Sequence, residues 1–245
     1  MRDALGSRIK RYEAVSNYRL TPRSPIFLRV DGKSFHTCTR QMERPFDRRL
    51  IGAMVAATQA TAKEMRGFKL AYTQSDEATF LLTDYDTFET QGWFDHEWQK
   101  LVSITASAFT AHFNRAIDAA LDPDHGMLFS DTMKRVAMFD ARAFVVPESD
   151  MANVFPWRHQ DWARNSPQML ARAHYTHAEL DKQKRADLHE LLYAKGVNWA
   201  TLDDQRKNGT YVARDGATRS DVLPVYAAIE ALLLEQLQAR EDATT

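Results

Sequence analysis

Two short motifs contain the side chains best suited to chemistry, and both present carboxylates. The first reads Arg-Val-Asp-Gly over residues 29–32, and the second reads Gln-Ser-Asp-Glu over residues 74–77. Carboxylates that converge repel one another unless a cation neutralises them. Mg²⁺ suits such a site because it prefers oxygen ligands and is commonly held by one or two carboxylates together with substrate phosphates. Asp31 and Asp76 therefore predict a metal site, and a pair of metal ions can activate an attacking hydroxyl and stabilise the leaving oxygens at phosphorus.

Each motif on its own has a plainer explanation. Asp31-Gly32 after an apolar run is ordinary turn chemistry, and Ser75-Asp76-Glu77 can simply close a turn. Gly32 adds to the functional interpretation, because a residue without a side chain lets the backbone approach an ion or a phosphate closely. The prediction of a metal site therefore depends on whether the fold brings the two motifs together.

The residues that follow the first motif fit a nucleotide site. Lys33 could pair with a phosphate, and Ser34 could donate a hydrogen bond to one. Phe35 and His36 could pack against a base or a sugar. The alternative is that Phe35 belongs to the core and that Lys33 is solvated. Arg44 precedes a predicted helix whose N-terminus favours an anion, so it would reinforce phosphate binding.

The composition is that of an ordinary globular protein. Of its 245 residues, 44% are hydrophobic and 27% are charged, and the formal net charge is −1. No overall basic field therefore indicates nucleic-acid binding, although a local basic face remains open. The single cysteine, Cys38, cannot form an intramolecular disulfide and favours a reducing compartment. Neither a signal peptide nor a membrane-spanning run is evident, so we expect a cytoplasmic protein without a membrane partner.

Hydrophobic spacing predicts the elements that must position the two motifs. Within residues 1–150 we expect strand, helix, hairpin, helix and strand, at residues 26–30, 45–64, 68–72 with 78–82, 97–120 and 143–146. This is the βαββαβ order of a ferredoxin-like α+β domain. In that arrangement the first strand is central and antiparallel to the third. Asp31, at the end of the first strand, therefore meets Asp76 and Glu77 at the start of the third.

The rest of the chain, residues 151–245, is predicted to be a mainly helical region packed on this first domain. In this second region we expect a hairpin tip at residues 207–209, and within the first domain we expect a turn-rich segment at residues 121–135. The predicted helices span residues 7–20, 151–175, 177–195 and 223–240.

At its two motifs the chain resembles the tRNA-His guanylyltransferase family, and within it the guanylyltransferase-like 3′-to-5′ polymerase branch of bacterial, phage and archaeal type. The resemblance covers most of the chain and rests on four runs, at residues 29–36, 71–77, 139–143 and 157–161. It implies a polymerase-palm-like domain and an enzyme that adds nucleotides to the 5′ end of tRNA. A 5′-monophosphate is first activated with ATP, or a triphosphate end is used directly. The 3′-hydroxyl of GTP or another NTP then attacks the activated 5′ phosphate.

The resemblance also implies roles for individual residues. Two Mg²⁺ ions would be held by Asp31, Asp76 and the carbonyl of Gly32, and Glu77 matches a position important to catalysis. Arg44 lies where a triphosphate-binding lysine is usual. Family members are usually homotetramers, built as dimers of dimers. The residues that match the family's nucleotide contacts are Asp31, Gly32, Lys33, Ser34, Phe35, His36, Ser75 and Asp76.

One departure from the family pattern concerns the RNA substrate. Eukaryotic members contain a His-Ile-Asn-Asn run after the Trp-Arg block, whereas residues 163–166 of this chain read Ala-Arg-Asn-Ser and keep only Asn165. The resemblance therefore favours template-directed repair of 5′-truncated tRNA over addition of the extra guanylate to tRNA-His. Arg158, Arg164 and Asn165 are the candidate RNA contacts, and such contacts would be sensitive to salt. A solvated helical face explains the same charges.

Two further functions stay open from the sequence. A palm-type nucleotide cyclase would use similar carboxylates but needs only an NTP. A non-catalytic tRNA-binding protein would need no metal site, and the intact Asp31, Asp76 and Glu77 argue against it.

Overall fold

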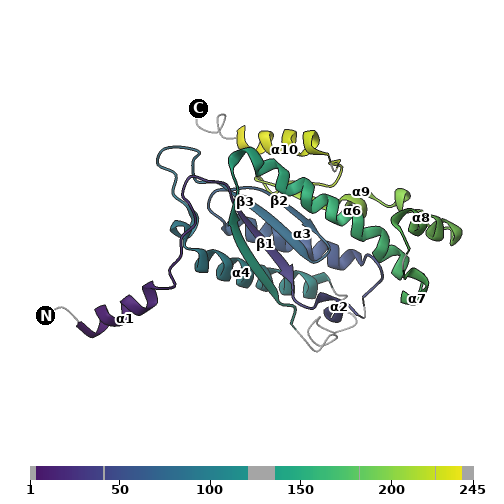
Figure 1. The fold of residues 1–245 in the computed structure, drawn as a ribbon, viewed down its shortest axis with the longest axis horizontal. Helices are drawn as coiled ribbons and strands as arrows, with labels where there is room; N and C mark the ends of the chain where they lie inside the picture. Colours follow the sequence, from purple (N-terminus) through teal and green to yellow (C-terminus); the bar gives the residue numbers. More distant parts are fainter. Residues whose placement is uncertain (1–3, 41, 121–135, 182, 224, 239–245) are drawn as a thin grey trace.

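A six-stranded antiparallel sheet forms the centre of the molecule (Figure 1). The structure is a computed structural model that describes residues 4–40, 42–120, 136–181, 183–223 and 225–238. The strands lie in the order β4-β1-β3-β2-β5-β6. The first four follow the ferredoxin-like βαββαβ arrangement, which confirms the predicted fold class. The strand bounds are β1 (Ile26–Gly32), β2 (Phe68–Gln74), β3 (Glu77–Leu82), β4 (Phe139–Val145), β5 (Thr210–Ala213) and β6 (Thr218–Arg219).

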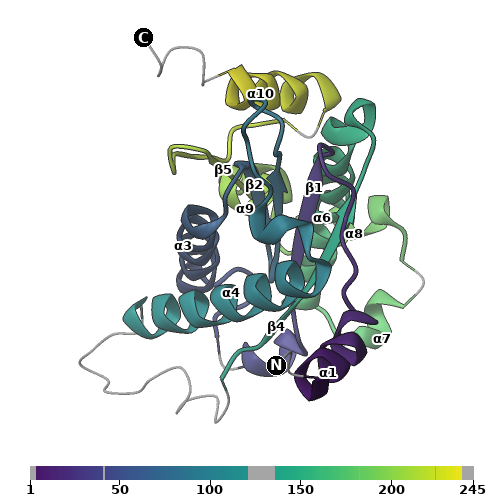
Figure 2. The same ribbon diagram turned by 90° about the vertical axis from the view of Figure 1, so that its left-hand side faces the viewer.

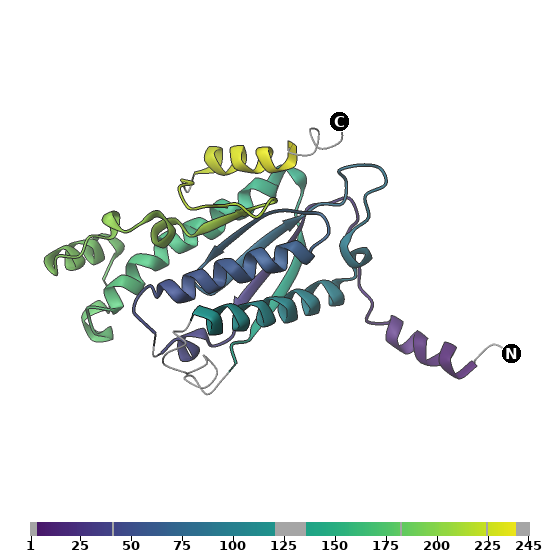
Figure 3. The same cartoon turned by 180° about the vertical axis from the view of Figure 1, so that it is seen from behind.

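Two long helices, α3 (Arg48–Glu64) and α4 (Trp98–Ala120), cover one face of the sheet (Figure 3). Small and apolar side chains recur along each helix at the spacing of an amphipathic helix, so each helix buries one stripe against the strands. Asp47 starts α3, because its side chain accepts a hydrogen bond from the backbone N–H of Arg49 at 2.8 Å. The resulting core includes Leu28, Val30, Ala57, Phe80, Phe109, Phe113 and Phe139.

The opposite face of the sheet is covered by α6 (Val154–Arg172) and α10 (Tyr226–Gln238), and Figure 2 shows the strands between α3 and α6. Residues 210–219 add β5 and β6 to the sheet beside β2, so the C-terminal region shares the sheet with the first 150 residues. A second core, which includes Phe27, Tyr72, Leu81, Phe155, Tyr211 and Leu233, fills the space between this face and its helices.

Shorter helices complete the chain. The helix α1 (Ala4–Ala14) buries no residue and projects from the body in Figure 1. Among the helices that the structure describes, none has the length and apolar character needed to cross a bilayer. The other short helices are α2 (Phe35–Cys38), η1 (Trp93–His96), η3 (Glu148–Asn153), α7 (His177–Leu180), α8 (Arg185–Ala194), η4 (Trp199–Thr201) and α9 (Asp204–Asn208).

The single helix predicted at residues 177–195 is wrong, because the chain forms α7 and α8 there. Thr176 caps α7 together with Glu179. The side chain of Asp187 accepts a hydrogen bond from the backbone N–H of Lys184 at 2.9 Å and starts α8. Local caps therefore divide a segment whose apolar residues suggested one helix.

The hairpin tip predicted at residues 207–209 is also misplaced. Asp203 caps α9 by accepting from the N–H of Arg206 at 3.0 Å, and α9 runs to Asn208. Gly209 then adopts a φ of +73° to lead into β5. The hairpin turns four residues later along β5, where the N–H of Ala213 donates to Ala217 O at 2.8 Å.

Strand β4 begins at Phe139, earlier than the predicted residues 143–146. In the first half of this edge strand, exposed Asp140 and Arg142 alternate with more buried neighbours. The continuous hydrophobic run therefore covers only the second half of the strand, and the prediction missed the first half. The helix predicted from residue 45 begins at Arg48 instead. The predicted turn-rich segment 121–135 lies outside the described residues.

Candidate functional site

The two carboxylate motifs meet at one end of the sheet. Asp31 in β1 lies opposite Glu77 in β3 in the antiparallel register. The backbone N–H of Gly32 donates a hydrogen bond to Asp76 O at 3.0 Å. The tight turn Ser75-Asp76 joins β2 to β3, and Ser75 adopts a φ of 50° there. The juxtaposition predicted from strand order is therefore confirmed.

The carboxyl group of Asp76 is held within this turn. Its Oδ1 accepts a hydrogen bond from the Ser75 hydroxyl at 2.9 Å. Burial raises the pKa of Asp76, the Ser75 hydrogen bond opposes that rise, and the charge of Asp31 adds to it. A cation beside the two carboxylates would relieve both the burial and the repulsion, which is the electrostatic condition of a metal site.

Gly32 brings the backbone close to Asp76. A Cβ atom at this position would lie 2.6 Å from Cδ2 of Phe35 and 3.0 Å from Cβ of Asp76. No larger residue fits unless one of these neighbours moves. The close approach of backbone to carboxylate is the property expected where an ion or a phosphate binds.

The donor set fits a hard cation that substrate helps to hold. Within the described part of the chain, no group of three or more His, Cys, Asp or Glu side chains is arranged to bind a metal ion. Asp31 and Asp76 instead offer two carboxylates, a number with which Mg²⁺ is commonly bound when phosphates and water complete its shell. Oxygen donors of this kind suit Mg²⁺ better than zinc, whose structural sites are built from thiolates and imidazoles.

Glu77 has different surroundings, although it follows Asp76 directly. Arg158 of α6 reaches both of its oxygens, with Nε 2.7 Å from Oε1 and Nη2 2.9 Å from Oε2. Nε of Arg29 lies 3.7 Å from Oε1. Burial raises the pKa of Glu77, and the charges of Arg158 and Arg29 oppose that rise. The carboxylate is therefore paired with cations of the chain itself.

The three predicted RNA contacts converge on Asp161. Nη2 of Arg158 lies 2.9 Å from Oδ2 of Asp161, and Nη2 of Arg164 lies 2.9 Å from Oδ1. The Asn165 amide donates to the same carboxylate at 3.4 Å. Arg158 is only 6% exposed, and its burial and its pairing with Glu77 and Asp161 do not favour the predicted contact with RNA. Arg164 and Asn165 are exposed.

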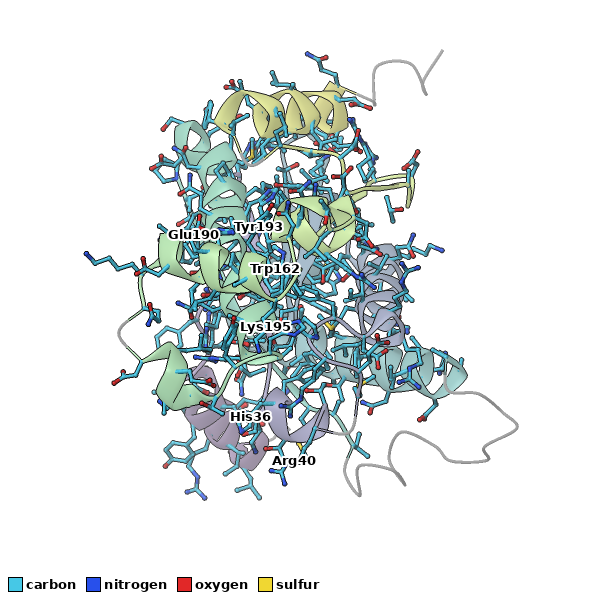
Figure 4. The ribbon with its side chains drawn as sticks, turned by 90° about the vertical axis from the view of Figure 1, so that its right-hand side faces the viewer. His36, Arg40, Trp162, Glu190, Tyr193 and Lys195 are labelled. Atoms are coloured by element: carbon cyan, nitrogen blue, oxygen red, sulfur yellow. The ribbon has the colours of Figure 1, made fainter. Side chains whose placement is uncertain are left out.

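A cavity of about 450 Å³ opens beside Asp76. This volume lies within the usual range for small-molecule sites. Figure 4 looks onto the end of the molecule that includes α2 and α8, with His36 labelled. Two predicted nucleotide contacts, Asp31 and the exposed Lys33, are not among the lining residues. The predicted nucleotide contacts that line the cavity are Gly32, Ser34, Phe35, His36, Arg44, Ser75 and Asp76.

The short helix α2 orients the residues that follow the first motif. Ser34 precedes the helix with a φ of 50°, and its hydroxyl makes no capping hydrogen bond. The ring of Phe35 packs against Phe113 and Phe139, with centroid distances of 5.5 and 5.4 Å. Phe35 therefore belongs to the core, as the alternative interpretation held, and forms a wall of the cavity. His36 remains exposed.

The anion site predicted at the start of α3 is already filled by the chain. Besides its bond to Arg49, the Asp47 carboxylate accepts a hydrogen bond from the backbone N–H of Glu43 at 3.0 Å. A second anion at this helix terminus would meet the charge of Asp47. Arg44 still lines the cavity, from the segment that precedes α3.

Two arginines near the site received no nucleotide-binding role from the sequence argument. Nη1 of Arg142 lies 3.9 Å from Oδ2 of Asp31, and 53% of its side chain is exposed. Arg172 lines the cavity from the last turn of α6, three residues after Met169, which lines it too. Strand alternation in β4 could have indicated Arg142, because it lies opposite Arg29 on the face of Asp31. The position of Arg172 could not be inferred from the sequence, because it depends on how α6 packs against the sheet.

Comparisons with known proteins identify relatives. Residues 6–147, more than half of the chain, match the family model described as Thg1, tRNAHis guanylyltransferase. The structure is similar to a bacterial tRNA(His) guanylyltransferase (Thg1)-like protein in complex with ATP, with 33% identity, a TM-score of 0.86, and coverage of 95% of this chain and 99% of that one. A bacterial protein of the same description in complex with GTP shows 31% identity, a TM-score of 0.76, and coverage of 95% and 98%. The tRNA(His) guanylyltransferase of Schizosaccharomyces pombe is 27% identical, over 84% of this chain and 79% of its own length.

Proposed function

The chain belongs to the tRNAHis guanylyltransferase family, and we propose that it adds nucleotides to the 5′ end of tRNA in the 3′-to-5′ direction with the help of Mg²⁺. Its α+β fold is that of the palm-type structures of this family, and the chain is a nucleotidyltransferase. The physiological reaction in this proposal is template-directed repair of 5′-truncated tRNA.

One observation supports the proposal more than any other. Asp31 and Asp76 come from separate motifs and meet at Gly32, beside a cavity of about 450 Å³. The carboxylates supply oxygen ligands, and the cavity has room for a nucleoside triphosphate. A structural turn alone would require neither the cavity nor the half-buried carboxylate of Asp76.

The residues of the chain divide the work between metal and nucleotide. Asp31, Asp76 and the Gly32 carbonyl would hold two Mg²⁺ ions, which supply positive charge where the phosphates react. Arg44, His36 and Ser34 line the cavity and would bind the triphosphate, with Arg172 from α6 as a further cation. A nucleotide held in this way would present its reacting atoms at a fixed geometry.

The proposed reaction has two steps. When the RNA ends in a 5′-monophosphate, an oxygen of that phosphate attacks the α-phosphorus of ATP, and pyrophosphate leaves. The 3′-hydroxyl oxygen of the incoming NTP then attacks the 5′ phosphorus of the RNA, the hydroxyl proton is lost, and AMP leaves. An RNA that ends in a 5′-triphosphate enters at the second step and releases pyrophosphate. The solved relatives with ATP and with GTP are consistent with both substrates.

The choice of RNA rests on the segment after the Trp-Arg block. Here Asn165 bonds to Asp161, and Ala163 and Arg164 stand where eukaryotic members have His and Ile. The bacterial Thg1-like proteins are also more similar to this chain than the fission yeast enzyme is. Both observations favour tRNA repair. Addition of the extra guanylate to tRNA-His is the second candidate, favoured by the description of the matching family.

The experiment is extension of a panel of tRNAs, full-length and 5′-truncated, with Mg²⁺, ATP and each labelled NTP supplied separately. We expect truncated tRNAs to gain the nucleotides that their 3′ strand templates. Guanylate added only to full-length tRNA-His would instead identify the second candidate. Label found only in a cyclic nucleotide would identify a cyclase, and tRNA binding without any extension would leave only a binding protein.

We further propose a cytoplasmic homotetramer, built as a dimer of dimers. The helix α1 supports self-association, because Leu5, Ile9 and Tyr12 are exposed at the spacing of one helix face. Light scattering after size exclusion tests the assembly, and a monomeric mass at micromolar concentration would refute it.

A further inference from the structure

The guanidinium of Arg158 contacts two carboxylates and one aromatic ring. It contacts Glu77 through Nε and Nη2, at 2.7 and 2.9 Å. It also contacts Asp161 through Nη2 at 2.9 Å. The ring of Trp157 covers it, with a distance of 4.3 Å from the guanidinium carbon to the ring centroid, and also lies 5.7 Å from the guanidinium of Arg29. Nη2 donates a hydrogen bond to Oε2 of Glu77, whereas the approach of Nε to Oε1 is an ion pair without hydrogen-bond geometry. One hydrogen bond and a charge contact at a second oxygen therefore hold the Glu77 carboxylate.

Glu77 in turn controls the turn that presents Asp76. It pairs with Gln74 across that turn, and its carbonyl accepts a hydrogen bond from the Thr73 hydroxyl at 3.0 Å. On its other side it lies opposite Asp31 in β1. A displacement of Glu77 would therefore move Asp76 relative to Asp31, because Asp76 precedes Glu77 directly in a tight turn and Glu77 is paired with Asp31 in the sheet.

We propose that Arg158 is a positioning residue for the metal and nucleotide site. It holds Glu77 and thereby fixes the separation of Asp31 and Asp76. This inference rests on the proposed function in one respect, since it takes those two carboxylates to be the metal ligands. It assigns α6 a part in the reaction that differs from RNA contact.

General stability is a weaker explanation for this pair. Replacing a buried ion pair by apolar residues often leaves the stability of a protein unchanged or improved, so such pairs are poor evidence of stabilisation. An apolar replacement would lose the contacts that hold the Glu77 carboxylate in its position. Lysine could keep the charge of Arg158, but its single ammonium group cannot reproduce the planar two-point contact.

The experiment is a double-mutant cycle on the full chain, with Glu77→Gln, Arg158→Met and the two combined. Arg158→Lys is added because it keeps the charge. The matched control is Lys69→Met with Asp86→Asn, which removes another buried ion pair, 2.6 Å long, from the start of β2. Circular dichroism establishes that each variant is folded. Two quantities are then measured: the affinity for Mn²⁺ without RNA or NTP, and kcat and KM for tRNA extension.

We expect folded Arg158→Met to bind Mn²⁺ about tenfold more weakly, the lower end of the effect of removing a partner that orients metal ligands. We expect kcat to fall about a hundredfold, with little change in the KM for RNA, because small misplacements of reacting groups cost this much. Arg158→Lys should not restore Mn²⁺ affinity. The double variant should lose no more than the worse single variant, and the control should match wild type in both measurements.

Wild-type Mn²⁺ affinity in folded Arg158→Met or Arg158→Lys would overturn the inference. Losses that multiply in the double variant would overturn it too, because they would show that Arg158 does not act through Glu77. The two proposals fail separately. Wild-type protein that binds Mn²⁺ through Asp31 and Asp76 but extends no tRNA would refute only the proposed function. Active wild type with unaffected Arg158 variants would refute only the positioning role.

Discussion

Acid should destabilise this protein through the buried side chain of His159. The ring is fully buried on the sheet-facing side of α6 and stacks on Tyr72 at a centroid distance of 5.4 Å, with Tyr211 at 6.2 Å. Burial lowers the pKa of His159 to about 4, against a weaker opposing effect of Asn208. In the unfolded chain its pKa is about 6.5. The unfolded state therefore takes up a proton through a pH range in which the folded state does not.

The sign and the size of the effect follow from this difference. The His159 contribution to the free energy of unfolding is complete above about pH 6.5 and is lost as the pH falls towards 4. One proton corresponds to about 1.4 kcal/mol per pH unit, so the total loss is about 3 kcal/mol. This is a large part of the usual stability of a folded domain.

The comparison of wild type with His159→Phe isolates this contribution. The variant keeps an aromatic ring against Tyr72 but removes the titrating group, whereas the carboxylates titrate in both proteins. Urea unfolding is followed by tryptophan fluorescence between about pH 7 and pH 4. We expect the stability difference to shift by about 3 kcal/mol in favour of the variant as the pH falls. A difference that stays constant across this range would refute the argument.

Three further predictions concern the site itself. Gly32→Ala should lower kcat for tRNA extension at least a hundredfold, because the new Cβ would lie 2.6 Å from Phe35 and displace the Asp76 turn. A folded variant with wild-type kcat would contradict this. Arg172→Ala should raise the KM for the NTP about tenfold while kcat changes little, since it removes one cation from the cavity wall. Steady-state kinetics with varied NTP concentration tests this. An unchanged KM would count against a role of Arg172 in nucleotide binding. Asp76→Asn should abolish nucleotide transfer. It should also raise the melting temperature of the metal-free protein at neutral pH, because burial and the charge of Asp31 disfavour the charged form of Asp76. A lower melting temperature than that of the wild type, measured in the presence of a chelator, would contradict this.

The meeting of Asp31 with Asp76 could be predicted because local patterns determine strand order in this part of the chain. The strands β1, β2 and β3 are apolar runs bounded by turn residues, and α3 and α4 show a clear helical period. Once the βαββαβ order is assigned, the antiparallel pairing of β1 with β3 follows, and the register places Asp31 opposite Glu77.

The environment of Glu77 could not be predicted in the same way. Its main partner, Arg158, is 81 positions away, on a helix whose docking no local pattern specifies. Arginines are seldom buried, so a surface role was the ordinary expectation for Arg158. The apolar spacing of residues 177–195 likewise predicted one continuous helix. It gave no indication of the helix starts at Thr176 and Lys184, which depend on local hydrogen bonds to Glu179 and Asp187.

The direction of synthesis is the central claim, and 3′-deoxy-GTP tests it most directly. In the proposed reaction the attacking hydroxyl belongs to the incoming nucleotide, so a nucleotide without its 3′-hydroxyl has no group with which to attack. The measurement compares GTP with 3′-deoxy-GTP on a 5′-truncated, ATP-activated tRNA whose next templated residue is G. We predict extension with GTP and none with 3′-deoxy-GTP. Addition of a single 3′-deoxyguanylate would contradict the 3′-to-5′ mechanism, because only synthesis in the opposite direction uses the hydroxyl of the RNA as the attacking group.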